Sequence, residues 1–252
     1  MSLSRTALLL AILLPASAVA DEGLIVAVAS NFRSAAEEIA REFTNASEIP
    51  VRISSGSTGM LYAQIVNGAP YDVFLAADAR RPQLLEAGAL AIDGSRTSYA
   101  TGSLVLWSVD SALAGQSCIE ALMSGSYRRI AVANPLTAPY GLAAEEFLKA
   151  IGVYDEASKR MVYGENIAQT LQFVASGNAT LGLIAASQVA DGLPEPGSCS
   201  WKVPAELHSA IDQQTIVLRN SRNLPAAQRF MEFLRSPQVA GILSRRGYGA
   251  PN

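Results

Sequence analysis

The chain has 252 residues, half of them hydrophobic, with 19 basic residues, 22 acidic residues and a formal net charge of −3. This length and hydrophobic content suffice for one large or two medium domains with packed cores. A slight acidic excess without clusters of Lys or Arg is not the charge pattern of a nucleic-acid-binding protein. One histidine and two distant cysteines exclude most zinc sites and most catalytic triads.

Residues 1–20 have the pattern of a secretory signal peptide. Arg5 is their only charge, the stretch 7–14 is almost entirely apolar, and Ala18 to Ala20 supply small residues just before Asp21. The apolar stretch is much shorter than the roughly 20 residues that a membrane-spanning helix needs. A buried or anchored N-terminal helix is the alternative. We therefore expect an exported protein that begins near Asp21.

Beyond this segment, strands and helices alternate. In chain order, the hydrophobic patterns predict the following elements: strand 24–29, helix 32–43, strand 51–54, helix 60–66, strand 73–76, helix 82–87, strands 104–109 and 130–133, helix 142–150, a short extended piece ending at 163, helix 168–175, strands 181–185 and 215–218, and two helices from about 226 and 238. This alternation predicts an α/β architecture with mostly parallel sheets.

The functional signal lies where predicted strands lead into helices. At four such junctions, 29–32, 54–59, 134–141 and 164–168, polar or turn-forming residues open the helix. A helix N-terminus has unpaired backbone N–H groups and the positive end of the helix dipole, so it favours an anion. Each junction taken alone is also typical of an ordinary helix cap. In open parallel sheets, however, the carboxyl ends of the strands face one crevice, so the four junctions can converge there.

The two cysteines, Cys118 and Cys199, lie 81 positions apart. After export they meet an oxidising compartment, which favours a disulfide between them. Closing a loop of this length stabilises a protein by about 4 kcal/mol in the chain-entropy model.

Several segments resemble the periplasmic molybdate-binding proteins. Residues 54–78 read SSGSTGMLYAQIVNGAPYDVFLAAD, and AVASN at 27–31, APYGLA at 138–143, LGLI at 181–184 and RGY at 246–248 continue the match in the same order. The resemblance covers essentially all of the chain after the signal peptide.

This resemblance implies a two-lobed periplasmic-binding-protein fold that closes on an oxyanion like a clamp. Each lobe is a mostly parallel sheet flanked by helices, and two hinge strands connect them, near 102–107 and 213–218. The expected domains are the signal peptide 1–20, lobe I at 21–102 and 214–252, and lobe II at 103–213.

The resemblance also implies the ligand contacts. Ser30 and Thr58 in lobe I, and Tyr140 and Ile167 in lobe II, match the family's contact positions, with Asn31 and Ser57 as adjacent candidates. Ile167 contributes only its backbone N–H. Some family members add a tyrosine hydroxyl from the strand at 183–186, but this chain has alanine at 185. Tyr140 is a candidate substitute, through its hydroxyl or its N–H.

The expected function is high-affinity periplasmic binding of molybdate or tungstate, with delivery to the permease of an ABC transporter. We expect no enzyme activity, no resident cofactor, no directly ligated metal and no nucleic-acid partner, and we expect a monomer. Another oxyanion, such as sulfate or phosphate, is the first alternative. A secreted serine hydrolase is the second, but the sequence has no Gly-x-Ser-x-Gly motif and His208 is the only histidine.

Overall fold

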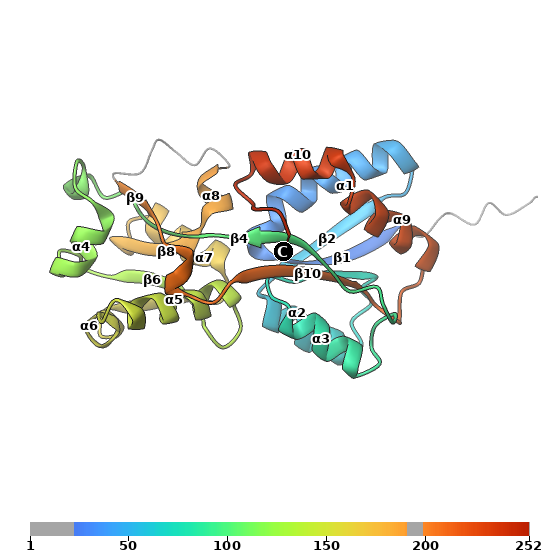
Figure 1. The fold of residues 1–252 in the computed structure, drawn as a ribbon, viewed down its shortest axis with the longest axis horizontal. Helices are drawn as coiled ribbons and strands as arrows, with labels where there is room; N and C mark the ends of the chain where they lie inside the picture. The colour runs from blue at the N-terminus through green and yellow to red at the C-terminus, as the bar shows by residue number, and fades with distance from the viewer. Residues whose placement is uncertain (1–22, 191–198, 252) are drawn as a thin grey trace, which may run out of the picture.

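The structure is a computed structural model that describes residues 23–190 and 199–251, and it shows two α/β lobes side by side (Figure 1). The predicted two-lobed fold is confirmed. The predicted signal peptide lies outside the described residues.

The first lobe contains a five-stranded sheet in the order β2-β1-β3-β10-β4. Its strands are β1 Leu24–Ala29, β2 Val51–Gly56, β3 Val73–Leu75, β4 Thr97–Gly102 and β10 Ile211–Val217. Its helices are η1 Ser30–Phe32, α1 Arg33–Ser47, α2 Thr58–Val66, α3 Arg80–Ala87, α9 Leu224–Leu234 and α10 Pro237–Arg245.

The second lobe contains a five-stranded sheet in the order β7-β6-β8-β5-β9. Its strands are β5 Leu104–Ser108, β6 Ile130–Ala133, β7 Met161–Gly164, β8 Leu181–Ala185 and β9 Cys199–Lys202. Its helices are η2 Ser111–Leu113, α4 Cys118–Ser124, α5 Pro139–Ala150, α6 Tyr154–Ser158, α7 Ile167–Ala175, α8 Ala186–Ala190 and η3 Ala205–Leu207.

In each sheet four strands run in one direction and one opposes them. Strand β1 is parallel to β2 and β3, whereas β10 is antiparallel to β3 and β4. Strand β6 is likewise parallel to β7 and β8, whereas β5 is antiparallel to β8 and β9. The mostly parallel strand direction is therefore as predicted. The opposing strand in each sheet is the one that follows a crossing, because it enters from the side that faces the other lobe.

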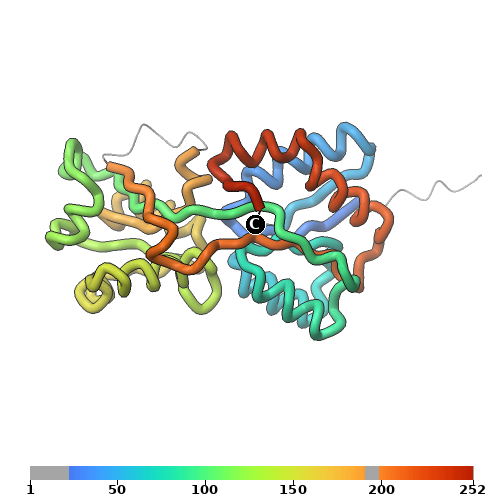
Figure 2. Tube along the Cα trace, in the orientation of Figure 1, coloured from blue at the N-terminus to red at the C-terminus, as the bar shows by residue number. Residues whose placement is uncertain are grey.

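The chain crosses between the lobes twice, and the two crossing segments run side by side in Figure 2. The first crossing joins β4 to β5 through Ser103 alone, and the second lies between β9 and β10. The second crossing therefore precedes the predicted range 213–218, because β10 pairs with β4 from Ile211 onward.

Helices cover both faces of the first sheet (Figure 1). The apolar side chains of β1 alternate in direction, as they do in any strand. Leu24, Val26 and Val28 pack against α1, α9 and α10, whereas Ala27 packs with α2 and α3 on the opposite face. The predicted apolar face of α1 is buried in the first of these clusters. Burial on both faces explains why β1 is apolar at every position.

The structure adds elements that the sequence patterns did not indicate, namely β4, β9, α4, α6 and α8. Strand β4 reads TSYATG and has no apolar run, and the three helices have seven residues or fewer. A helix of that length is too short to show a 3.6-residue period. Helix α5 begins earlier than predicted, with Pro139 in its first turn, where proline is favoured.

A disulfide joins Cys118, at the start of α4, to Cys199 in β9, with their Cα atoms 5.4 Å apart. It ties the edge strand of the second sheet to a helix of the same lobe. Across residues 23–190 and 199–251, no helix combines the length and the apolar character needed to cross a membrane.

Candidate oxyanion site

The four strand-to-helix junctions meet at one small cavity of about 10 Å³ between the lobes. The cavity is lined by Ala29, Ser30, Asn31, Gly56, Ser57, Thr58, Ala77, Ala138, Pro139, Tyr140 and Ile167. All six residues predicted as ligand contacts are in this set. Each lobe contributes two junctions, so the first turns of η1, α2, α5 and α7 point their unpaired N–H groups toward the same space.

On the first lobe, Ser30 and Asn31 follow directly after β1 and form the start of η1. Asn31 is buried, and its side-chain amide is held by the protein, since Nδ2 donates to Gln213 Oε1 at 2.8 Å. Its carbonyl oxygen accepts from Tyr248 Oη at 2.7 Å and from Ser187 Oγ at 3.2 Å. These contacts fix the turn that presents Ser30 and Asn31 to the cavity.

Ser57 and Thr58 stand at the start of α2, and both are almost fully buried. Ser57 caps the helix, with its Oγ accepting from the Met60 N–H at 3.4 Å. Thr58 Oγ1 accepts from the Ala77 N–H at 3.2 Å. A hydroxyl both accepts and donates. Because both oxygens already accept, each proton remains available to donate into the cavity.

On the second lobe, Tyr140 and Ile167 lie in the first turns of α5 and α7. Asn166 caps α7 by accepting from the N–H groups of Ala168 and Gln169 at 3.0 and 3.1 Å. The Ile167 N–H precedes these two and is not used by the cap. The phenolic Oη of Tyr140 points toward the hinge, because a Cβ built on Gly102 would stand 2.3 Å from it. The Tyr140 N–H lies in the first turn of α5, where a backbone N–H has no partner within the helix.

Of the residues that the structure describes, no charged side chain lines the cavity. Arg33 is exposed and pairs with Glu37, and Glu165 is exposed on the turn before α7. Burial, with a smaller contribution from Tyr248, raises the pKa of Tyr140 well above its usual value of 10, so its phenol stays neutral. The arrangement is a set of neutral donors around a small cavity, which can hold an anion but offers no carboxylate as an acceptor.

The lobes touch each other at the rim of the cavity. The Gly59 N–H of the first lobe donates to the Thr137 carbonyl of the second at 2.8 Å. Arg81, which is paired with Asp78, donates from Nη2 to the Leu136 carbonyl at 3.1 Å. With the Ser187–Asn31 bond, these contacts hold the two lobes in a closed arrangement around the cavity.

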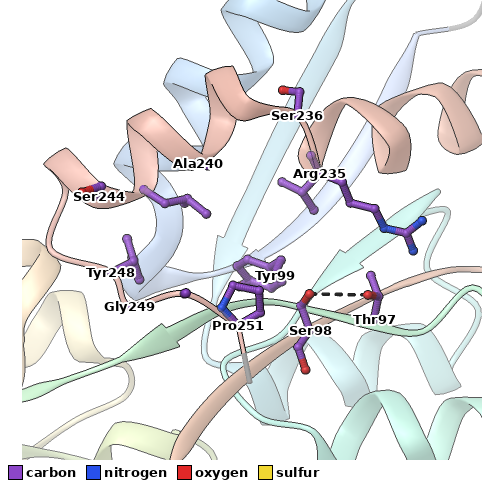
Figure 3. Close-up of a pocket in the computed structure, with 13 residues that line it drawn as sticks. Thr97, Ser98, Tyr99, Arg235, Ser236, Ala240, Ser244, Tyr248, Gly249 and Pro251 are labelled. Carbon is purple, nitrogen blue, oxygen red and sulfur yellow. Dashed lines mark hydrogen bonds between the residues drawn. The ribbon is translucent and has the colours of Figure 1, made fainter.

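Sequence reasoning missed three residues behind the site, Gln213, Tyr99 and Tyr248. Tyr99 Oη lies 3.1 Å from Gln213 Oε1, and all three side chains are buried. Figure 3 shows Tyr99 and Tyr248 at the inner wall of a separate pocket of about 390 Å³ between β4 and α10. Tyr248 ends the matched segment 246–248, which was its only signal. Gln213 begins the predicted second hinge strand, and Tyr99 had no signal.

The remaining predicted features lie away from the cavity. Ala185 is fully buried and does not line it, in keeping with the expected loss of that family contact. His208 Nδ1 lies 2.8 Å from the Ser209 carbonyl oxygen and is outside the site. Within the described ranges, no group of three or more His, Cys, Asp and Glu side chains is arranged to hold a metal ion.

Comparisons with known proteins agree with this geometry. Residues 24–249 match the family described as bacterial extracellular solute-binding protein. The molybdate-binding protein ModA of Azotobacter vinelandii is 39% identical over 249 residues, 98% of each chain. ModA of Rhodobacter capsulatus is 39% identical over 242 residues, 96% of this chain and 93% of the relative.

Among solved structures, the Azotobacter vinelandii periplasmic molybdate-binding protein has a TM-score of 0.86 at 37% identity. The match covers 91% of this chain and 100% of that one. The chain therefore belongs to the bacterial extracellular solute-binding proteins, in the same family as these molybdate-binding proteins.

Proposed function

We propose that this protein binds molybdate in the periplasm and delivers it to the permease of an ABC transporter. The observation that carries the proposal is the closed cavity at which four helix N-termini meet without a charged side chain. The two molybdate-binding relatives, each 39% identical to this chain, support the same cargo. The protein is accordingly a binding protein and not an enzyme.

The six predicted contact residues are divided between the two lobes. Ser30, Ser57 and Thr58 donate from hydroxyl groups, and Asn31 lies beside them. Tyr140 and Ile167 donate from the backbone N–H groups that open α5 and α7. Each hydrogen bond to a charged group contributes roughly 1.5–3 kcal/mol, which offsets the loss of water around the anion.

Neutral donors favour an anion that is fully deprotonated at neutral pH. Molybdate, tungstate and sulfate meet this condition. Phosphate keeps a proton that needs an acceptor, and the exposed Glu165 carboxylate is not in the cavity lining. Sulfate is smaller than molybdate and leaves some donors too far away. Tungstate has nearly the size and charge of molybdate, so we propose that it binds as well.

The two sheets are proposed to move as two lobes. We assign residues 21–102 to lobe I, together with the C-terminal part of the chain, and the stretch between them to lobe II. The boundary predicted at 214 is best set at Ile211, where pairing in the first sheet begins. We also propose that residues 1–20 direct export as a signal peptide, that the chain acts as a monomer, and that closure creates the surface the permease recognises.

The test is isothermal titration calorimetry of the chain from Asp21 onward against molybdate, tungstate, sulfate and phosphate. We expect tight one-to-one binding of molybdate and tungstate and much weaker binding of sulfate and phosphate. Preferential binding of sulfate or phosphate would support anion binding between the two lobes but contradict molybdate as the ligand. Binding of none of the four anions would contradict the proposed function.

A further inference from the structure

Gln213 is a fully buried polar side chain on β10, next to the point where this strand leaves the hinge. Its Oε1 accepts from Asn31 Nδ2 at 2.8 Å and lies 3.1 Å from Tyr99 Oη, whose one proton is shared with the Ala76 carbonyl oxygen at 3.1 Å. An amide has one acceptor end and one donor end. Because Oε1 faces Asn31 and Tyr99, the orientation of the amide is fixed and Nε2 must point the other way.

The donor end of Gln213 points toward Gly102, the last residue of β4. A Cβ built on Gly102 would lie 3.0 Å from Gln213 Nε2 and 2.3 Å from Tyr140 Oη. The two atoms therefore share one small space, which only glycine at 102 leaves open. The first atom belongs to lobe I and the second to lobe II.

Within the described part of the chain, Gln213 Nε2 has no hydrogen-bond partner. Tyr140 Oη has no well-formed hydrogen bond either, although the Asn31 side chain is close enough to lower the pKa of the phenol. A buried donor without a partner costs about 1–3 kcal/mol, so such atoms are rarely left unpaired. An N–H donor and a phenolic oxygen are complementary. Both atoms lie within 3.0 Å of the same point beside Gly102, so they are close to one another.

We propose that Gln213 is a positioning residue that locks the hinge by donating from Nε2 to Tyr140 Oη when the lobes seat fully on the anion. The proposal rests on the proposed function, because it takes the cavity as the oxyanion site. Gln213 touches no anion. It holds Asn31 on one lobe and Tyr140 on the other, so it couples the two halves of the cavity through the hinge.

The first test is a double-mutant cycle with Tyr140→Phe and Gln213→Met, which remove the two partners with little change in shape. Each single variant should weaken molybdate binding about three- to tenfold, mainly through faster dissociation in stopped-flow experiments. The double variant should bind molybdate no more weakly than the single variant with the lower affinity. Gln214→Met is the matched control, since Gln214 bonds to Ser98 and Asp212 away from the cavity, and it should leave the affinity unchanged.

The second test uses the shared space at Gly102. Gly102→Ala places a methyl group against Tyr140 Oη, so it should weaken molybdate binding in the wild-type background. Tyr140→Phe removes that oxygen. In the Tyr140→Phe background, Gly102→Ala should therefore weaken molybdate binding clearly less than in the wild type. This partial rescue requires the hydroxyl to lie where we place it and is not expected from a general loss of stability.

The same cycle is read as urea midpoints without and with molybdate. Some coupling should remain without the anion, because both atoms lie against Gly102, and it should grow when molybdate holds the lobes together. Failure of the wild-type chain to bind molybdate contradicts the proposed function, and the urea cycle then tests the pair by itself. Additive effects of Tyr140→Phe and Gln213→Met in every readout would overturn the proposal, as would an equal cost of Gly102→Ala in both backgrounds.

Discussion

At the scale of single residues, Thr58 shows how the first residue of a helix can donate a hydrogen bond to an anion. Its Oγ1 accepts the Ala77 N–H, which fixes the rotamer and leaves the hydroxyl proton as the free end. Thr58→Ala should weaken molybdate binding at least tenfold, because one bond to a charged group is lost in a buried site. Titration calorimetry measures the change.

Thr58→Ser is the matched control for this prediction, since it keeps the hydroxyl and removes only a methyl group. It should retain most of the affinity and the wild-type unfolding temperature, whereas Thr58→Ala should unfold at a lower temperature because the buried Ala77 N–H loses its acceptor. An unchanged affinity in Thr58→Ala would mean that the pocket has been assigned to the wrong residues.

The lining residues were predictable from the sequence, but those behind them were not. Ser30, Ser57 and Thr58 stand at strand-to-helix junctions, where hydroxyl residues have a local reason to be, and the family resemblance then selected among them. Gln213 has no such context. It sits beside Gln214 in β10, and alternation sends only one of the two side chains toward the cavity. Which face is buried depends on β3 and β4, far away in the sequence.

At the scale of elements, the start of α2 forms the contact between the lobes. A Cβ on Gly59 would lie 2.9 Å from both the Cα and the carbonyl oxygen of Thr137, a backbone position that cannot turn aside. Gly59→Ala should therefore hinder closure and weaken molybdate binding by about tenfold. It should not destabilise the fold, because alanine favours the helix. Calorimetric titration and thermal melts check the two parts.

Gly241→Ala is the control for Gly59→Ala. Gly241 also lies in a helix, α10, and a Cβ there would meet only the end of the Arg245 side chain at 3.5 Å. It should leave the affinity unchanged. Equal affinities for Gly59→Ala and the wild type would show that the lobes need not come this close to bind the anion.

The packing of α1 against α10 includes an ion pair that makes stability depend on pH. Hydrogen bonds from Arg246, assisted by Arg245, hold the pKa of Glu38 below its usual value. A carboxyl whose pKa is lower in the folded state stabilises the fold above its unfolded-state pKa, about 4.3, and loses this effect as the pH falls through the folded-state pKa. Glu38→Gln should therefore lower the free energy of unfolding at pH 7 by less than about 1 kcal/mol.

Urea unfolding at several pH values tests this. The difference in the free energy of unfolding between Glu38→Gln and the wild type should shrink on acidification. It should disappear below both the folded-state and the unfolded-state pKa of Glu38. Glu37→Gln serves as control, since Glu37 pairs with Arg33 on the exposed side of α1 and does not join two helices. A difference that grows toward low pH would contradict the assignment.

The disulfide belongs to the same scale, because it ties β9 to α4. Replacing both cysteines by serine should lower the free energy of unfolding by about 4 kcal/mol, the value expected for a closed loop of this length. Molybdate affinity should change little, since neither cysteine is near the cavity. Denaturant melts measure the loss. Two free thiols in the unfolded, unreduced protein would contradict the pairing.

The elements with a strong local pattern were predictable, and those that depend on partners were not. Buried strands such as β1, β6 and β8 read as short apolar runs, and the predicted bounds match the observed ones. Strand β4 has no such run. It forms a strand because it pairs with β10, and β10 comes after all of lobe II in the sequence. The position of the second crossing was misjudged for the same reason.

At the scale of the whole molecule, the binding site exists only where the two lobes meet. Each lobe carries two of the four helix N-termini, so neither half alone surrounds an anion. Binding energy is thereby coupled to lobe position, since a ligand that contacts both lobes favours the state in which they are together. The protein should accordingly be more open without molybdate than with it.

Small-angle X-ray scattering measures this directly. Adding molybdate to the anion-free chain should lower the radius of gyration, and adding sulfate at the same concentration should not. In Gly59→Ala the decrease should be smaller at saturating molybdate, because the Thr137 backbone blocks full approach of the lobes. If calorimetry shows tight binding while the radius of gyration stays constant, the lobes are already closed in the free protein. Selectivity would then come from a rigid cavity, with access to it limited by rare opening.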